Sequence, residues 1–317
     1  MKRFFQKKKI MVIGDLMIDE YILGEVVRIS PEAPVPVLKV REKSKRAGGA
    51  GNVLLNLSSL GMDVIAVGRV GHDHEGLSLK EAFISEGMCV EGIFTDLSYQ
   101  TPVKSRMIAS GQQLLRVDYE WPTPLTCAME DKVIEALSAL LVGVEMVAFS
   151  DYAKGFLTTS FLKRSIALIQ EREIPIIVDP KGVDFLRYKG VTFMKPNLSE
   201  AFHAAKLGME ASLDEVADRI LKEIEVETLI ITRAKEGITI FGKEGRLDFP
   251  AHIHEVKDVT GAGDTVLAVM TATLANGCDL SYAARCANVA AGLAIQRIGC
   301  ARISLEELLS CLIELQI

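Results

Sequence analysis

Short apolar runs alternate with longer amphipathic stretches along most of the chain. The apolar runs show little polar alternation, which is typical of parallel strands buried on both faces of a sheet. They occupy residues 10–13, 64–67, 146–149, 174–178, 193–194 and 228–231. The periodicity between them predicts helices over residues 50–60, 75–86, 130–141, 159–170, 198–206 and 213–224. This alternation predicts an α/β fold with a doubly wound, mostly parallel sheet flanked by helices.

Two segments interrupt this rhythm. Residues 21–40 and 101–117 have strand-like alternation, but no helix separates their halves. The first segment carries Pro31, Pro34 and Pro36, and proline suits sheet edges and turns rather than a central strand. We therefore predict a small separate β-sheet that projects from the main body and serves as a lid.

The composition favours one globular domain, which we expect to span residues 1–317. Apolar residues make up 49% of the chain, which is ample for a core. The formal net charge of −6 gives no basis for a nucleic-acid partner. The basic start leads into an apolar run that ends at Gly14, without a small-residue cleavage site. We expect no membrane segment and a cytoplasmic location.

Cysteine and histidine give no strong metal signal. The cysteines form no C-x-x-C pair and are expected to be reduced core thiols. They are Cys89, Cys127, Cys278, Cys286, Cys300 and Cys311. The pairs His72/His74 and His252/His254 would each share one face of a strand, but neither has a third ligand nearby.

The most informative stretch, residues 258–264, reads Asp-Val-Thr-Gly-Ala-Gly-Asp and opens an apolar, helical last third of the chain. Small residues at a helix start expose free backbone N–H groups, which can hold a phosphate. Asp264 would lie beside that anion site, where a carboxylate could take a proton from an attacking hydroxyl. The alternative is an ordinary glycine-rich turn whose aspartate complements the helix dipole.

A second glycine cluster precedes the helix predicted from residue 50. Gly48 and Gly49 would allow a ligand to approach the backbone closely, and Asn52 offers a donor and an acceptor to a hydroxyl. Asp15 follows the first strand, at the edge where ligands gather in open α/β sheets, and could accept hydrogen bonds from sugar hydroxyls. A plain strand-to-helix connection with Asn52 near the cap is the alternative.

Two common nucleotide-binding motifs are missing. The G-x-G-x-x-G fingerprint is absent after the first strand, which counts against an NAD-dependent oxidoreductase. Gly71 and Gly76 have the Walker A spacing, but Leu77 stands where that motif needs lysine. ATP would therefore bind through a different architecture.

Residues 195–200, Lys-Pro-Asn-Leu-Ser-Glu, follow a predicted strand and offer polar groups to a nucleotide. Asn197 and Glu200 could orient Mg²⁺ through water, with Ser199 between them. Equally, Asn197 could cap the next helix with Glu200 as its capping-box partner.

Together these motifs resemble the ribokinase/PfkB family of sugar kinases over nearly the whole chain. The cluster from Gly48 to Asn52 is similar to the family's N-terminal signature, and residues 258–264 are similar to the C-terminal one. The resemblance implies a ribokinase-like fold with ATP and Mg²⁺ as cofactors. It also implies that Asp264 is the catalytic base and that the amides of Gly261, Ala262 and Gly263 form the anion hole.

The same resemblance assigns residues to the nucleotide. Asn197 and Glu200 match the Asn-x-x-Glu magnesium motif. Thr232 with Gly237 resembles a turn that contacts the nucleotide, and Asn288 falls where the family lines the adenine pocket.

Three further runs, residues 29–37, 112–118 and 150–155, resemble the heptose branch of the family. That branch comprises D-glycero-D-manno-heptose 7-phosphate kinases, which phosphorylate the anomeric hydroxyl in making the lipopolysaccharide inner-core precursor. The third run contains Asp151, which we expect to contact the sugar. The resemblance implies an ATP-dependent heptose 7-phosphate 1-kinase.

The phosphate of such a substrate needs cations, and Lys104 and Arg106 on the predicted lid could supply them. The alternative is that both are ordinary surface charges. Sheet edges tend to pair unless they are covered, so we also predict a homodimer through the lid.

The pattern departs from the family at Ala234, where glycine is usual, and at Leu54, where a small residue is usual. No H-x-G-H is present, so we expect only the kinase step and no nucleotidyltransferase. Another PfkB-type kinase, acting on ribose, fructose or fructose phosphate, is the close alternative. A catalytically silent sugar or nucleotide sensor is the alternative from a different class, and the intact Asp264, Asn197 and Glu200 argue against it.

Overall fold

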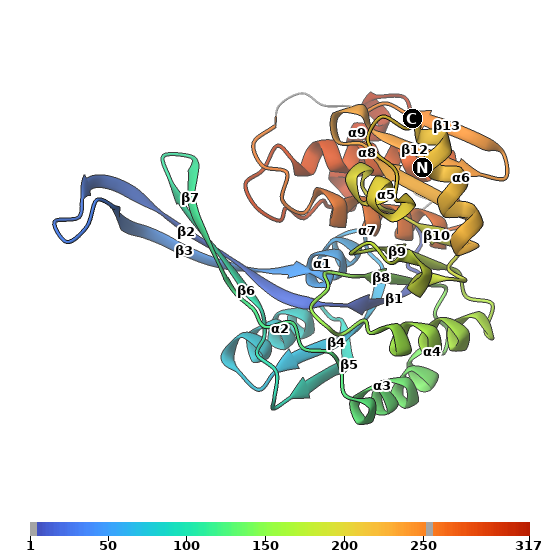
Figure 1. Ribbon diagram of the computed structural model, residues 1–317, viewed down its shortest axis with the longest axis horizontal. Helices are drawn as coiled ribbons and strands as arrows, with labels where there is room; N and C mark the ends of the chain where they lie inside the picture. The colour runs from blue at the N-terminus through green and yellow to red at the C-terminus, as the bar shows by residue number, and fades with distance from the viewer. Residues whose placement is uncertain (1–4, 252–255) are drawn as a thin grey trace.

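A computed structural model describes residues 5–251 and 256–317, and it contains a larger β-sheet flanked by helices and a smaller β-sheet (Figure 1). Among the described residues, the larger sheet has nine strands in the order β13-β12-β11-β10-β9-β8-β1-β4-β5. These strands are β1 (Lys9–Gly14), β4 (Asp63–Gly71), β5 (Cys89–Asp96), β8 (Met146–Ser150), β9 (Ile176–Asp179), β10 (Phe193–Met194), β11 (Thr228–Thr232), β12 (Ile238–Gly242) and β13 (Gly245–Phe249). Neighbours pair in parallel from β5 to β11, whereas β12 runs antiparallel to β11 and β13.

Helices cover both faces of this sheet because its central strands are apolar on both sides. In β1, Ile10 and Val12 join one core while Met11 and Ile13 join the other. The first core includes residues of α1 (Ala50–Ser59), α2 (His74–Ser85), α7 (Ala262–Ala275), α8 (Leu280–Ala294) and α9 (Leu305–Glu314). The second includes residues of α3 (Cys127–Leu140), α4 (Thr159–Gln170), α5 (Leu198–Ala205) and α6 (Leu213–Ile224). Full burial of one such side chain contributes about 1.5–3 kcal/mol, so the two cores hold the layers together.

The prediction of a doubly wound sheet is confirmed, with two additions at its edges. The edge strand β5 and the hairpin β12–β13 lie outside the predicted strands. The strand β5 mixes buried and exposed positions, and β13 is largely exposed, so neither resembles a continuous apolar run. An antiparallel edge on an otherwise parallel sheet is common in α/β proteins.

The smaller sheet has the order β3-β2-β6-β7 and projects from the main body as a long, twisted arm (Figure 1). Its strands are β2 (Leu16–Ile29), β3 (Pro36–Gly49), β6 (Val103–Ala109) and β7 (Gln112–Tyr119). The predicted small sheet is therefore confirmed, although β2 starts before residue 21 and β3 continues past residue 40. Pro31 and Pro34 lie in the turn between β2 and β3, where no ladder hydrogen bond is needed.

The larger sheet changes direction next to β1. The chain runs from β1 to β4 and β5 on one side, and then returns to β8 on the other side. Gly14 pairs with Ser150 at the carboxyl ends of β1 and β8. Ligands of open α/β sheets bind outside the carboxyl ends at such a switch point. This topology brings Asp15 and Asp151 to one place.

Two short 3₁₀ turns, η2 (Phe185–Tyr188) and η3 (Ala234–Glu236), complete the described secondary structure. No helix in the described part of the chain has the length and apolarity needed to cross a bilayer. The six cysteines all lie in that part and are unpaired.

Candidate active site

The start of helix α7 places Asp264 in the first helical turn. Gly261 precedes the helix with a φ of +78°, a left-handed conformation that glycine adopts without strain. A β-carbon at Gly261 would lie 2.6 Å from the side-chain nitrogen of Asn52. The Ala262 amide donates to the carbonyl of Val259, and no side chain caps the helix among the described residues. The remaining first-turn amides are therefore available to an anion.

Asp264 itself is buried, with 3% of its surface exposed. Burial, together with the smaller effect of the nearby charge of Asp179, raises the pKa of this carboxyl to about 7. Hydrogen bonds from Tyr152 and Asn52 and the charge of Lys195 oppose the rise. A carboxylate with a pKa near neutrality is suited to general-base catalysis.

Two side chains donate to the two oxygens of Asp264. The Tyr152 hydroxyl donates to Oδ1 at 2.6 Å, and the Asn52 amide donates to Oδ2 at 2.9 Å. Asn52 lies in the first turn of α1, and Asn56 donates to its Oδ1 at 3.1 Å. Asn52, which was predicted to contact the sugar, thus donates directly to the proposed base.

Asp15, in contrast, is surrounded by backbone amides. Its carboxylate accepts the N–H groups of Tyr152 at 2.9 Å, Lys154 at 3.1 Å and Phe156 at 3.2 Å. Burial and the charge of Asp151 raise the pKa of Asp15 to about 6. Asp15 therefore anchors the loop that follows β8, and this loop carries Tyr152.

The two glycines predicted to face the substrate end β3 beside Asp15. Gly49 has a φ of +57°, and a β-carbon there would lie 2.7 Å from the carbonyl oxygen of Asp15. Gly48 pairs with Met17 across the sheet and packs against the carboxylate of Asp19. These glycines allow the chain to pass close to the carboxyl end of β1.

Asp151 is buried at the end of β8 and has three protein partners. The Tyr188 hydroxyl donates to it at 2.7 Å, the Ala153 amide donates at 2.7 Å, and Arg187 forms an ion pair at 3.4 Å. Asp151 also lines the cavity described next, so its proposed contact with the sugar stays a prediction.

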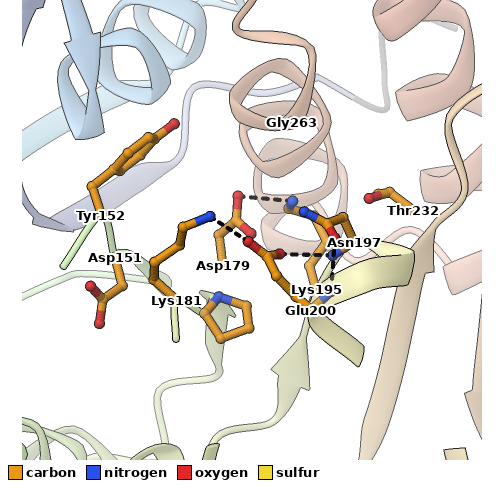
Figure 2. A pocket seen from close by; sticks show the side chains of 10 residues that line it. Asp151, Tyr152, Asp179, Lys181, Lys195, Asn197, Glu200, Thr232 and Gly263 are labelled. Carbon is orange, nitrogen blue, oxygen red and sulfur yellow. Dashed lines mark hydrogen bonds and ion pairs between the residues drawn. The ribbon is translucent and has the colours of Figure 1, made fainter. Parts of the chain in front are cut away.

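A cavity of about 170 Å³ opens beside the start of α7. Lys195, only 2% exposed, reaches into it and forms an ion pair with Asp179 at 2.8 Å. A β-carbon at Gly263 would lie 3.9 Å from the ammonium nitrogen of Lys195. A buried cation and an uncapped helix start thus meet at one point, which suits a phosphate. The lining residues are Asp151, Tyr152, Asp179, Pro180, Lys181, Lys195, Asn197, Glu200, Thr232 and Gly263 (Figure 2).

Asn197 and Glu200 form the capping box that sequence analysis left open as an alternative. The Asn197 side chain accepts from the Glu200 amide at 2.9 Å, and Glu200 accepts from the Asn197 amide at 3.0 Å. Figure 2 shows Glu200 between Asn197 and Lys181, whose ammonium donates to it at 2.6 Å. Ser199 contacts His203 at 3.5 Å, on the outer side of α5.

The donor set fits a magnesium ion held mainly by phosphates. The described residues contain no group of three acidic, histidine or cysteine side chains that could hold a metal by themselves. Mg²⁺ at nucleotide sites usually keeps several waters and takes one or two carboxylates plus substrate phosphates. One carboxylate and one amide at the cavity wall, Glu200 and Asn197, meet that requirement.

The residues predicted to contact the nucleotide fall into two groups. Thr232 ends β11, bridges to Asn197 and lines the cavity. Gly237 and Asn288 lie together instead at the end of β13. The Asn288 amide donates to the carbonyl of Phe249 at 3.0 Å, and a β-carbon at Gly237 would overlap the same carbonyl.

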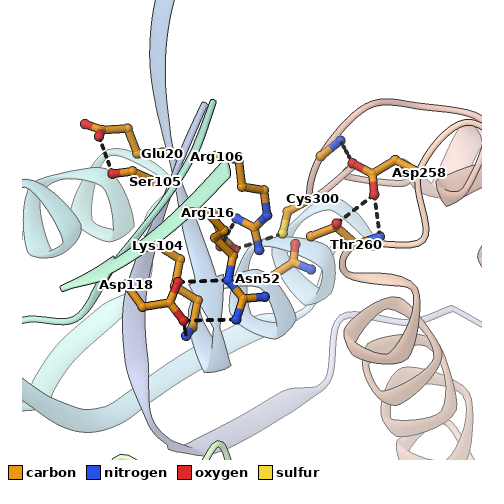
Figure 3. A network of polar contacts seen from close by, with 12 residues as sticks. Glu20, Asn52, Lys104, Ser105, Arg106, Arg116, Asp118, Asp258, Thr260 and Cys300 are labelled. Carbon is orange, nitrogen blue, oxygen red and sulfur yellow. Dashed lines mark hydrogen bonds and ion pairs between the residues drawn. The ribbon is translucent and has the colours of Figure 1, made fainter. Parts of the chain in front are cut away.

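The two predicted lid cations already have carboxylate partners (Figure 3). Arg106, on β6, forms an ion pair with Asp19, and its guanidinium lies 5.4 Å from the centre of the Tyr21 ring. Lys104 contacts Asp118 at 3.0 Å and Glu120 at 2.8 Å.

Both cations are largely shielded from water, and Arg106 is 9% exposed. Glu120 is shared with Lys154 at 2.8 Å, so two lysines converge on one carboxylate. Lys154 belongs to the loop that Asp15 anchors.

One of the two histidine pairs considered for a metal lies in the described part of the chain. His72 lies in a bend and His74 opens α2, so this pair is not on a strand and the geometry considered for it is not met. His252 and His254 lie outside the described residues.

Sequence analysis missed the roles of Asp179 and Lys195. Asp179 ends β9, and the rule that singled out Asp15 at a strand's carboxyl end applies to it equally. Lys195 stands directly before the Pro-Asn pair, and a lysine so close to a buried strand was a usable signal. Tyr152 was seen only as part of a motif.

Comparison with known proteins agrees with this fold and site. Residues 7–308 match the family described as pfkB family carbohydrate kinase, and the chain belongs to this family. Carbohydrate kinases are phosphotransferases, which is consistent with a buried carboxylate and a cavity lined by a buried lysine.

Among curated proteins, the chain is similar to the Bifunctional protein HldE of Geobacter metallireducens, with 43% identity over 302 residues. That match covers 94% of this chain and 62% of that protein. The Bifunctional protein HldE of Geotalea uraniireducens is 41% identical over 303 residues, covering 95% of this chain and 62% of that protein. The chain therefore spans less than two thirds of the length of these relatives.

Solved structures share the fold at low sequence identity. A putative ribokinase from Agrobacterium tumefaciens aligns with a TM-score of 0.79 at 14% identity, covering 98% of this chain and 99% of that chain. A ribokinase from Arabidopsis thaliana, complexed with ribose and ATP, aligns with a TM-score of 0.74 at 18% identity, covering 97% and 99%. The ribokinase-like fold and the PfkB resemblance are thereby confirmed.

Proposed function

We propose that this chain transfers the γ-phosphate of ATP to a sugar hydroxyl, with Asp264 as the base. The observation that carries the proposal is the buried carboxylate of Asp264 in the first turn of an uncapped helix, beside the cavity that contains Lys195. Phosphoryl transfer depends mainly on positioning and on electrostatic stabilisation. This site supplies a base, oriented amides and a buried cation within one small volume.

In the proposed reaction the sugar oxygen bonds to phosphorus, the bond from phosphorus to ADP breaks, and the hydroxyl proton passes to Asp264. The amides of Gly261 and Gly263 at the start of α7 and the ammonium of Lys195 offset the charge on the phosphoryl group, and the Ala262 amide would join them by leaving the Val259 carbonyl. Apart from the Ala262 amide, these groups are in place before any ligand arrives, so little reorganisation is needed.

The nucleotide is proposed to occupy the side of the site near β11 and α8. Asn197 and Glu200 would hold Mg²⁺ through water, and Ser199, Thr232, Gly237 and Asn288 would contact the nucleotide. Mg²⁺, when bound, neutralises charge on the nucleotide phosphates.

For the acceptor we propose D-glycero-D-manno-heptose 7-phosphate, phosphorylated on its anomeric 1-hydroxyl to give the 1,7-bisphosphate. This step would serve lipopolysaccharide inner-core (ADP-heptose) synthesis. The three heptose-branch runs support the proposal, as does the similarity to proteins named Bifunctional protein HldE. Asp15, Gly48, Gly49, Asn52 and Asp151 are the proposed sugar-side residues. Another PfkB-type sugar or sugar-phosphate kinase is the alternative.

The substrate phosphate would bind at Lys104 or Arg106 by replacing a carboxylate partner. Lys104 has two such partners, and it shares Glu120 with Lys154. A phosphate that displaced Glu120 could therefore meet two ammonium groups at once. Arg106 is paired with the buried Asp19, so its release requires a larger change.

A kinase assay across phosphorylated and free sugars, with the product position assigned by NMR, tests the proposal. Heptose 7-phosphate should be preferred, and Lys104→Gln or Arg106→Gln should weaken it about ten- to a hundred-fold relative to the free sugar. Lys39→Gln, on the exposed face of β3, is the matched control. Equal losses for both sugars would remove the phosphate role, and absence of phosphoryl transfer to any sugar would overturn the proposal.

We also propose a homodimer through the small sheet. Its outer strands and tip expose apolar side chains, including Val27 at 70%, Ile29 at 60% and Leu115 at 54%. Such edges favour pairing with another chain. Sedimentation at micromolar concentration should give a dimer that Leu115→Lys weakens, whereas Ile313→Lys on α9 leaves it intact. A wild-type monomer would contradict the proposal.

A further inference from the structure

Tyr152 is the nearest donor to the proposed base. Its hydroxyl donates to Oδ1 of Asp264 at 2.6 Å, while Asn52 donates to Oδ2 at 2.9 Å. Each carboxylate oxygen thus has one side-chain donor. An oxygen of an ionised carboxylate has more than one lone-pair direction, so either can still accept a further hydroxyl.

The loop that carries Tyr152 is fixed by hydrogen bonds to its backbone. Asp15 accepts the amides of Tyr152, Lys154 and Phe156, and the buried Arg69 donates to the carbonyl of Lys154 at 3.4 Å. A tyrosine on a freely moving loop would hold a partner poorly. Here the backbone of Tyr152 is held by Asp15, the residue that directly follows β1.

We propose that Tyr152 is a positioning residue for Asp264, holding its Oδ1 in one orientation and stabilising the ionised carboxylate that must accept the sugar proton. The inference rests on the proposed function for its kinetic consequence, but not for the contact itself. Tyr152 keeps its own proton, since burial and the charge of Asp264 raise the pKa of its hydroxyl well above the ordinary value. The proton from the sugar therefore goes to Asp264 alone.

Several charged and titratable groups around Asp264 also change its pKa, and the effect of Tyr152 is compared with theirs. Asp179 at the end of β9 raises the pKa of Asp264, and Lys195 lowers it. The Cys300 thiol lies nearby and stays protonated because burial raises its pKa. Against the dominant effect of burial, the Tyr152 hydrogen bond is the largest influence that lowers the pKa of Asp264.

The test is Tyr152→Phe, which removes the hydroxyl and keeps the ring. A carbon-13 NMR titration of the aspartate carboxyls in the free enzyme, assigned with Asp264→Asn, should show the pKa of Asp264 rising by about one to two pH units. The acid limb of kcat/KM should move up by the same amount, because the base must be deprotonated. At a pH well above the limb, the rate should return toward that of wild type.

Tyr188→Phe is the matched control for the acid limb. It removes a tyrosine hydroxyl that donates to another buried carboxylate, Asp151, at 2.7 Å. The Asp264 titration and the acid limb should stay where they are in wild type. If the acid limb of the pH profile of kcat/KM moves equally in Tyr152→Phe and Tyr188→Phe, the proposal is overturned.

A second variant tests the opposite direction. Replacing Tyr152 by 3-fluorotyrosine makes the phenol a stronger donor, so the Asp264 titration should move to lower pH. If Tyr152→Phe lowers the rate by one factor at every pH and leaves the titration unchanged, the role is only structural and the proposal fails. The NMR titration needs no substrate, so it decides the contact even if the enzyme phosphorylates no sugar.

Discussion

Asp15 and Asp264 are both buried carboxylates with a raised pKa, yet they are held in different ways. Asp15 accepts three backbone amides from one loop, and those amides cannot move without moving the chain. Asp264 accepts hydrogen bonds from two side chains, Tyr152 and Asn52, which belong to separate parts of the chain. The first arrangement is suited to fixing a loop. The second leaves room for another ligand and can be tuned by single side chains.

The comparison teaches that a perturbed pKa alone does not identify the base. Burial is the largest cause of the raised pKa at both residues. What separates them is the neighbourhood, because only Asp264 lies in an uncapped first turn beside a buried cation. The following predictions test this distinction.

Asp264→Asn should have the largest effect. Loss of general-base catalysis lowers kcat by about 10²–10⁴-fold, while binding of ATP and sugar stays nearly intact. Steady-state kinetics with separate binding titrations measure the two effects. Asp279→Asn, the N-cap of α8, is the matched control and should keep its rate because asparagine also caps well. A turnover within tenfold of wild type would exclude Asp264 as the base.

Asp15→Asn should act mainly on stability. Asparagine has one acceptor oxygen where three amides converge, so at least one buried amide loses its partner. A hydrogen bond to a charged group contributes about 1.5–3 kcal/mol, and the free energy of unfolding should fall by a similar amount. Urea denaturation measures it. The distinction between the two carboxylates breaks down if stability is unchanged and kcat falls as far as in Asp264→Asn.

Stability should also depend on pH in a way that separates the two residues. A carboxyl whose pKa is raised on folding binds its proton more tightly in the folded state, so stability falls as pH rises through that window. For Asp264 the window ends at a pKa of about 7, and for Asp15 at about 6. The Tm of Asp264→Asn relative to wild type should therefore increase from pH 5 to pH 8. Calorimetry that finds a constant difference would contradict the raised pKa.

Glu200 is an intermediate case, held by one backbone amide and one lysine. Glu200→Gln keeps an acceptor for the Asn197 amide, so the helix cap should persist. If Glu200 acts through Mg²⁺, the concentration of Mg²⁺ for half-maximal rate should rise several-fold with little change in sugar affinity. An unchanged Mg²⁺ titration would leave Glu200 with its capping role only.

Much of the fold could be predicted because local pattern and global packing agree. The buried strands read as apolar runs, and the two cores confirm that both faces are covered. Strand β13 was missed because it is short and largely exposed, whereas β12 is a short buried apolar run that the same pattern could have identified. Strands β2 and β3 were placed correctly but too short. Residues 41–46 of β3 are polar and largely exposed, whereas the buried start of β2 follows β1 after a single residue and has no turn signal before it.

The motifs of the site could be predicted from the sequence, but the hydrogen-bond and ion-pair partners of its side chains could not. A glycine-rich turn before an apolar helix was enough to select Asp264. That its oxygens meet Tyr152 and Asn52, residues 112 and 212 positions away in the chain, depends on the order of strands in the sheet. The same holds for Lys104 and Arg106, whose carboxylate partners follow from strand register and the packing of distant segments.

The joints between the arm and the main body carry a mechanical consequence. A single residue, Asp15, separates β1 from β2, and α1 starts directly after β3. The Ala50 amide donates to the Asp15 carbonyl at 3.1 Å, so the two joints are tied to each other. The connection therefore contains no linker residue besides Asp15. A tilt of the arm must therefore rotate the peptide units at Asp15. The loop of residues 152–156, whose amides donate to the Asp15 carboxylate, would move with them.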